Sequence, residues 1–222
     1  RLTDKRILNA AIESSSLVRA QLETQLSMGL PNSPMHGAKV KVASCNAITA
    51  KPAGIIKGVD LQHTSIVRKI DTDAINTLLD LGNLVLLSPI GYSPSGDTFS
   101  LSYQNIGAEL AIALKADKLI AFSASDGLST QEGKLIREVT TAEARKQLEQ
   151  QQNNHSQYGC AAAAIHAVEQ GVPRAHIMNY TMDGALLQEL FSVDGAGTLI
   201  LNSQFEDIRR ASSDDIPAIV DI

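Results

Sequence analysis

The sequence predicts an α/β fold in which helices cover both faces of a largely parallel, doubly wound sheet. Segments with the 3.6-residue periodicity of helices alternate with short apolar segments typical of strands, which is the pattern of βαβ units. The continuous apolar run from Leu84 to Leu87 is typical of a central parallel strand that is buried on both faces. We therefore expect one large α/β domain over most of the 222 residues.

Capping residues and turn residues set the expected limits of the elements. Thr3 and Asp71 are expected helix caps, and Thr140 with Glu143 forms the Thr-x-x-Glu pattern of a capping box. Glycine and proline interrupt residues 47–69, which indicates hairpins over the end of a sheet. We predict helices over 3–28, 72–81, 103–116, 141–151, 160–170 and 185–191, strands over 39–44, 84–87, 119–123, 176–179 and 198–201, and a polar loop over 150–156.

The pattern of strands and helices changes from Ile208 onward, and we place a domain boundary near residues 203–207. Residues 1–204 are expected to form the first domain and residues 205–222 the start of a second, opening with a short strand at 208–211. Because the chain starts at Arg1 and stops at Ile222 within expected helices, we expect a piece of a longer protein.

Composition excludes several classes of partner. The net charge of −5 and scattered basic residues indicate no binding of nucleic acid or of an anionic membrane, and no apolar run reaches the ~20 residues of a membrane span. Cys45 and Cys160 stand far apart without a secretory segment, which favours reduced thiols in the cytoplasm. The five histidines are dispersed singly, so no metal site is expected.

Three stretches resemble known families. Residues 122–128 (FSASDGL) resemble the strand and turn of amino acid kinases that approach the nucleotide base. Residues 183–191 (DGALLQELF), followed by 195–198 (GAGT), are similar to the signature of arginine-sensitive acetylglutamate kinases and N-acetylglutamate synthases. Residues 208–216 resemble the start of a GNAT acetyltransferase domain. This order is that of bacterial N-acetylglutamate synthases, so the resemblance implies an amino-acid-kinase-like fold whose phosphate loop would lie before Arg1.

The resemblance also implies a function. A protein of this family transfers the acetyl group of acetyl-CoA to L-glutamate in the first step of arginine biosynthesis and is inhibited by L-arginine as effector. It would be a cytoplasmic homo-oligomer, with acetyl-CoA as co-substrate of the acetyltransferase domain and no cofactor in this chain. Two alternatives remain: an acetylglutamate kinase that uses ATP, and a standalone arginine-binding module without enzymatic activity.

Three positions argue against kinase activity. By resemblance, Ser100 stands where a kinase holds its substrate with asparagine, and Gln104 stands where it carries an organising aspartate. A second catalytic lysine would align near Cys160, in a segment without any cation. Phosphoryl transfer depends on charged groups that position and stabilise the phosphates, so we expect these positions to be inactive.

The expected arginine site lies around Glu189. A guanidinium favours a carboxylate that accepts paired hydrogen bonds, and an α-carboxylate favours the exposed N–H groups of glycine-rich turns. By resemblance, Glu189 holds the guanidinium, Gly195 and Gly197 face the arginine backbone, and Tyr180 forms a wall. From spacing alone, Glu189 is more readily a solvated helix residue and Gly195 a simple turn.

Overall fold

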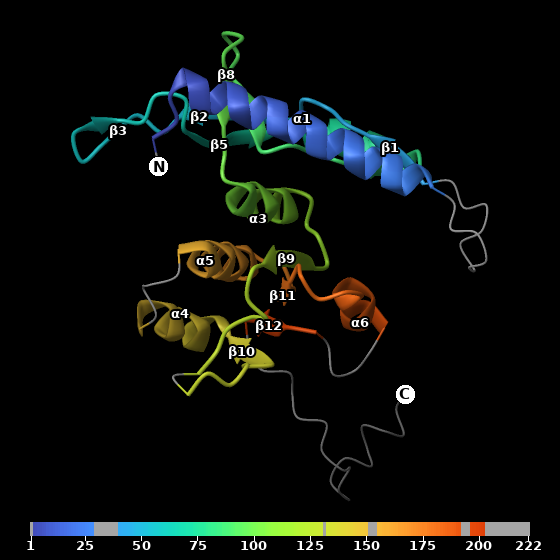
Figure 1. The fold of residues 1–222 in the computed structure, drawn as a ribbon, viewed down its shortest axis with the longest axis vertical. Coiled ribbons are helices and arrows are strands. Elements are labelled where there is room, and N and C mark those ends of the chain that lie inside the picture. Colours follow the sequence, from blue (N-terminus) through green and yellow to red (C-terminus); the bar gives the residue numbers. More distant parts are fainter. Residues whose placement is uncertain (1, 29–39, 131, 151–154, 192–195, 203–222) are drawn as a thin grey trace, which may run out of the picture.

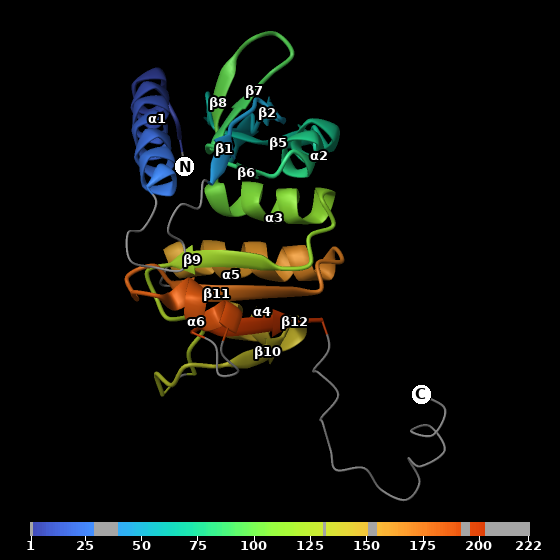
Figure 2. The same ribbon diagram turned by 90° about the vertical axis from the view of Figure 1, so that its right-hand side faces the viewer.

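The protein consists of two tiers of sheet and helix with one helix between them (Figures 1 and 2). The structure is a computed structural model that describes residues 2–28, 40–130, 132–150, 155–191 and 196–202. Figure 2 shows α1 and the strands up to β8 in the upper tier, the strands from β9 to β12 in the lower tier, and α3 between the two. The predicted domain boundary and the second-domain residues 205–222 lie outside the described residues.

The upper tier is built on a four-stranded sheet in the order β5-β2-β7-β8. Strand β2 pairs antiparallel with β5 and parallel with β7, and β7 pairs antiparallel with β8. Side chains of β2 and β8 bury themselves with Ile106 of α3, which joins this sheet to the helix below. The elements are α1 (Lys5–Ser27), β1 (Lys41–Ala43), β2 (Ile48–Pro52), β3 (Ile55–Ile56), β4 (Val59–Asp60), β5 (Ser65–Ile70), α2 (Thr72–Asp80), β6 (Asn83–Val85), β7 (Ile90–Tyr92), β8 (Thr98–Ser100) and α3 (Tyr103–Ala113).

The N-cap of helix α1 lies one residue later than predicted. The side chain of Asp4 accepts a hydrogen bond from the Ile7 N–H at 2.8 Å and is therefore the N-cap. Thr3 is buried instead, because it pairs with Gln62 as an isolated parallel bridge and its hydroxyl bonds Thr64 at 2.9 Å. The tertiary pairing of Thr3 therefore moves the cap to Asp4, and α1 begins at Lys5.

The prediction of a buried central strand at 84–87 is wrong. The strand is the short β6, which pairs in parallel with β1 in a two-stranded sheet, and Leu84 is 40% exposed. An apolar run indicates a buried strand only if the neighbouring strands cover it, and periodicity does not show which neighbours the chain supplies.

The lower tier is a mixed four-stranded sheet in the order β10-β12-β11-β9. Strand β11 is parallel to β9 but antiparallel to β12, which is parallel to β10. Its elements are β9 (Leu119–Ser123), β10 (Glu138–Thr140), α4 (Thr141–Gln150), α5 (His155–Glu169), β11 (Arg174–Asn179), α6 (Ala185–Phe191) and β12 (Thr198–Leu201). Helix α5 starts at His155, so the predicted polar loop at 150–156 is too long by the first residues of that helix.

Helices cover both faces of this sheet. On one face, Ile165 and Val168 of α5 pack with Ile177 of β11 and with side chains of α4 and β12. On the other face, Ala185 of α6 packs with Met178 of β11. The predicted α/β class with helices on both faces is confirmed, although the sheets are less uniformly parallel than the sequence indicates.

Two further observations bear on the classes of function that the sequence excludes. Within the described ranges, no helix has the length and apolar character needed to cross a membrane. Among the same residues, no group of three or more His, Cys, Asp or Glu side chains is placed to hold a metal ion.

Candidate functional site

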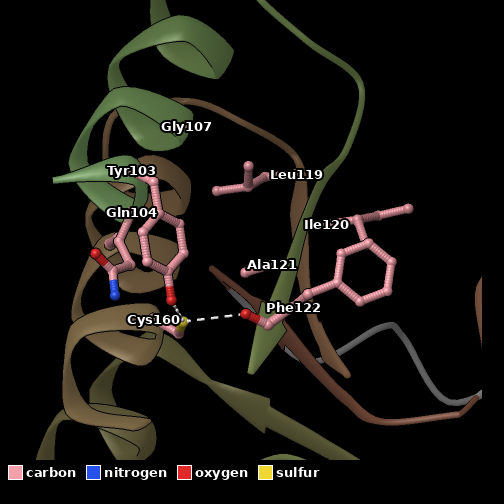
Figure 3. A pocket seen from close by; sticks show the side chains of 9 residues that line it. Tyr103, Gln104, Gly107, Leu119, Ile120, Ala121, Phe122 and Cys160 are labelled. Atoms are coloured by element: carbon pink, nitrogen blue, oxygen red, sulfur yellow. Dashed lines mark hydrogen bonds between the residues drawn. The ribbon is translucent and has the colours of Figure 1, made fainter. Parts of the chain in front are cut away.

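The first candidate site is a pocket between α3, β9 and α5 (Figure 3). It has a volume of about 190 Å³ and is lined by Tyr103, Gln104, Gly107, Leu119, Ile120, Ala121, Phe122, Cys160 and Ala163. Two of the positions predicted from the kinase pattern, Gln104 and Cys160, meet here although they are far apart in sequence. None of the lining side chains is charged at neutral pH, so the pocket offers phosphate no cation.

Gln104 is held by the cap of its own helix. Ser102 caps α3 by accepting the Asn105 N–H, and its hydroxyl donates to Oε1 of Gln104 at 2.5 Å. A Cβ atom at Gly159 of α5 would lie 3.3 Å from Nε2 of Gln104, so the amide also packs closely on the facing helix. The side chain that α3 contributes to the pocket at position 104 is therefore a neutral amide held on both sides.

Cys160 forms the floor of the pocket. It is fully buried, and its thiol donates to the Phe122 carbonyl at 3.5 Å and lies 3.9 Å from the Tyr103 hydroxyl, as Figure 3 shows. Burial raises the pKa of the Cys160 thiol, and hydrogen bonds from Tyr103 and Gln104 oppose this only in part. Cys160 is therefore a neutral thiol without the reactivity of a thiolate.

Ser100 is not brought into this pocket. It ends β8, where its carbonyl accepts a hydrogen bond from the Ser65 hydroxyl at 3.1 Å and its N–H bonds the His63 carbonyl. Ser100 therefore belongs to the upper sheet and is not among the residues that line the pocket with Gln104 and Cys160.

Gly107 lies in the middle of α3 on the wall of this pocket. A Cβ atom there would meet only Leu119 Cδ1, at 3.8 Å, which is an ordinary contact. We therefore expect Gly107→Ala to raise the free energy of unfolding by about 0.5–1 kcal/mol, because alanine has the higher helix propensity. Chemical denaturation measures this change, and a decrease in stability would contradict the packing described for α3.

The second candidate site lies where α6, β11 and the start of β12 meet. The Glu189 side chain is only 7% exposed, and its Oε2 accepts the Ala196 N–H at 2.8 Å. Its Oε1 contacts Nδ1 of His176 on β11. The carboxylate therefore joins helix α6 to β11 and to the residues just before β12, and Glu189 is not a solvated helix residue.

His176 is the residue of this site that the sequence analysis missed. It is buried on β11, and its Nε2 atom has no hydrogen-bond partner among the residues that the structure describes. Burial lowers the pKa of His176, Glu189 opposes this shift, and the positive charges of Lys118 and Arg174 add to it. One feature of the sequence could have indicated its role. His176 is a polar residue within an apolar strand, and a buried polar side chain needs a partner.

The other residues predicted for the arginine site are Gly197, Tyr180 and Gly195, and their positions relative to Glu189 differ. A Cβ atom at Gly197 would lie 1.9 Å from the Ile177 carbonyl oxygen, so only glycine fits against β11 at this point. Tyr180 follows β11 directly, and its side chain is 62% exposed. Gly195 lies outside the described residues. The structure thus gathers Glu189, His176 and the 196–197 backbone, with Tyr180 at the surface.

The pKa shift of His176 predicts a pH dependence of stability. The unfolded chain takes up a proton at about pH 6.5, whereas folded His176 does so only at lower pH. The stability linked to neutral His176 is therefore present above about pH 6.5 and lost as the pH falls below it. In His176→Gln, we expect melting temperatures at pH 7.5 and 5.5 to differ less than in the unsubstituted protein.

His166→Gln is the matched control, because His166 is an exposed histidine that pairs with Glu109 at 3.3 Å. If His166→Gln reduced the pH dependence as much as His176→Gln, the buried histidine would not be its source.

Proteins of known identity resemble this chain over its whole length. Amino-acid acetyltransferases from Pseudomonas fluorescens strain Pf-5 and Pseudomonas syringae pv. tomato are 43% and 42% identical to it over 222 residues. The crystal structure of N-acetylglutamate synthase from Neisseria gonorrhoeae, complexed with coenzyme A and L-arginine, matches all of this chain with a TM-score of 0.88 and 36% identity. The chain spans about half of each of these proteins, 51% in each case.

More distant proteins share the fold alone. The structure of carbamate kinase from Giardia lamblia bound to AMP-PNP matches 89% of this chain and 90% of the kinase chain, with a TM-score of 0.56 at 14% identity.

The sequence pattern of the amino acid kinase family matches residues 4–179, which include β1 to β11 and the pocket between α3, β9 and α5. This match covers most of the sequence, and the chain belongs to the amino acid kinase family.

Proposed function

We propose that this chain is the kinase-like, arginine-sensing part of a glutamate N-acetyltransferase, and that it catalyses no phosphoryl transfer. The observation that carries this proposal is the uncharged lining of the pocket between α3, β9 and α5. A kinase needs cations and an organising carboxylate around the transferred phosphate, and removal of a single stabilising group commonly reduces the rate by ~10²–10³.

The charge of Glu189 supports arginine as the ligand of the second site. A carboxylate has about four lone-pair positions, and the contacts to the Ala196 N–H and to His176 use only some of them. The remaining positions suit the paired N–H groups of a guanidinium. The Neisseria gonorrhoeae synthase that this chain resembles was crystallised with L-arginine, which favours the same effector here.

The substrates of the whole protein follow from its relatives. We propose acetyl-CoA and L-glutamate as substrates, N-acetyl-L-glutamate as product, and arginine biosynthesis as the pathway, in a cytoplasmic homo-oligomer. The Neisseria gonorrhoeae relative bound coenzyme A in one structure together with L-arginine and in another with N-acetyl-glutamate. In this proposal the residues beyond 204 begin the acetyltransferase domain, and this chain contributes regulation rather than catalysis.

An assay of ATP turnover tests the proposal against the alternative of an acetylglutamate kinase. We expect the intact protein to form no ADP in response to N-acetyl-L-glutamate, because Gln104 and Cys160 supply neither a carboxylate nor a cation. Release of ADP that depends on N-acetyl-L-glutamate would overturn the assignment. An acetylglutamate kinase of known activity, assayed in parallel, establishes that turnover would have been detected.

A further inference from the structure

Two of the stretches that resemble known families, residues 122–128 and 195–198, meet at Thr198. This residue is the first of β12, and it is completely buried. Its hydroxyl accepts the Leu128 N–H at 2.8 Å and donates to the Ile136 carbonyl at 2.6 Å. These partners lie 70 and 62 residues away in the sequence, so one hydroxyl joins the start of β12 to a distant segment of the chain.

The Thr198 hydroxyl lies in the neck of the loop formed by residues 128–136. The Ile136 N–H donates to the Leu128 carbonyl at 2.8 Å, and Ser129 and Leu135 form an isolated antiparallel bridge. In a regular antiparallel pair, the Leu128 N–H would bond the Ile136 carbonyl in return. The hydroxyl is inserted between these two groups and satisfies both. Its removal would therefore take away a partner from each side of the neck.

Gly127 allows Thr198 to come this close. The φ angle of Gly127 is +144°, a conformation that residues with a Cβ atom rarely adopt. A Cβ atom there would also overlap Oγ1 of Thr198 and would lie 3.0 Å from the Thr198 Cβ. Any side chain at position 127 would therefore push the hydroxyl out of the neck.

The residues around Thr198 also fix the backbone of the proposed arginine site. Ala196 donates its N–H to Glu189, and Gly197 lies directly against the Ile177 carbonyl. Thr198 holds the following position through the neck of the loop. Because each residue has only two soft backbone dihedrals, anchors on both sides leave Gly197 little freedom.

We propose that Thr198 is a positioning residue of the arginine site. Its hydroxyl holds the 196–197 backbone and the Glu189 carboxylate in the geometry that receives arginine, and bound arginine in turn keeps the neck of the 128–136 loop closed. This inference rests on the proposed arginine site at Glu189. Coupling between two sites is reciprocal, so opening of the neck weakens arginine binding by the same factor by which arginine opposes the opening.

Two substitutions of Thr198 separate the hydroxyl from the bulk of the side chain. Thr198→Val keeps a β-branched side chain and removes the hydroxyl, whereas Thr198→Ser keeps the hydroxyl. In calorimetric titration of the intact protein with L-arginine, we expect the affinity to fall at least about fivefold in Thr198→Val, the low end of coupling between linked sites. Thr198→Ser is expected to bind arginine within about twofold of the unsubstituted protein.

Val168→Ala is the control for a general loss of stability, because it opens a cavity at a buried position of α5 in the same tier. We expect it to bind arginine with unchanged affinity. Unchanged affinity in Thr198→Val, or an equal loss in Thr198→Val and Val168→Ala, would overturn the positioning role.

Hydrogen exchange of the Leu128 N–H gives a readout that a merely structural role would not change. With arginine bound, we expect this amide to exchange at least about fivefold more slowly in the unsubstituted protein and in Thr198→Ser, but not in Thr198→Val. The Ala74 N–H, which the Asp71 side chain accepts at the cap of α2, is the control and is expected to exchange at the same rate with and without arginine.

The two ways in which this inference could fail are distinguishable. Binding of arginine without any slowing at Leu128 would overturn the role of Thr198 and leave the proposed function intact. A lack of arginine binding in the unsubstituted protein would overturn both.

Discussion

Gly197→Ala is expected to lower the free energy of unfolding by about 3 kcal/mol or more, near the upper end of the effects of overpacking. The added Cβ would lie 1.9 Å from the Ile177 carbonyl oxygen and 2.9 Å from its carbonyl carbon. Both atoms belong to the backbone of β11, so no side-chain rotation relieves the contact. The start of β12 would have to move away from β11, which would disturb the paired Ile177 and Thr198.

Thermal unfolding of the intact protein measures this effect. For a domain of this size, 3 kcal/mol corresponds to a fall in melting temperature of roughly 6–12 °C. Gly107→Ala is the matched control, because it adds the same methyl group where there is room and is expected to stabilise α3. If Gly197→Ala changed the stability no more than Gly107→Ala does, the close approach of β12 to β11 would be wrong.

Glu189→Gln is expected to weaken arginine binding by a factor of roughly 10–150, the equivalent of losing about 1.5–3 kcal/mol from a hydrogen bond to a charged group. The substitution retains an oxygen that can accept the Ala196 N–H, so the turn before β12 keeps its support. It removes the negative charge that faces His176 and that we propose to bind the guanidinium. The change therefore separates the charge of the carboxylate from its structural role.

Calorimetric titration of the intact protein with L-arginine measures the affinity. Glu138→Gln, at an exposed position of β10, is the control for loss of one negative charge. Equal affinity in Glu189→Gln and in the unsubstituted protein would remove Glu189 from the arginine site.

Local features of the fold were predictable where a short segment determines its own structure. The Thr140 hydroxyl accepts the Glu143 N–H at 3.3 Å and the Glu143 carboxylate accepts the Thr140 N–H at 3.1 Å, which confirms the capping box. Asp71 caps α2 as predicted, by accepting the Ala74 N–H. These interactions span three residues, so the sequence contains all of the partners.

Features that depend on distant partners were not predictable. The cap of α1 shifted because Thr3 pairs with residues near position 62, and the run at 84–87 became the short β6. His176 could not be assigned to the site because its partner, Glu189, lies on another element. The resemblance to kinases predicts Gln104 and Cys160 as degenerate positions, but only the fold places them in one pocket.

The initial rate of coenzyme A release tests most directly whether this chain is the arginine-sensing part of an acetyltransferase. The intact protein is supplied with acetyl-CoA and L-glutamate, and the rate is followed as L-arginine is added. We predict glutamate-dependent release of coenzyme A that falls as the concentration of arginine rises. A rate that does not respond to arginine, or the absence of glutamate-dependent release, would contradict the account.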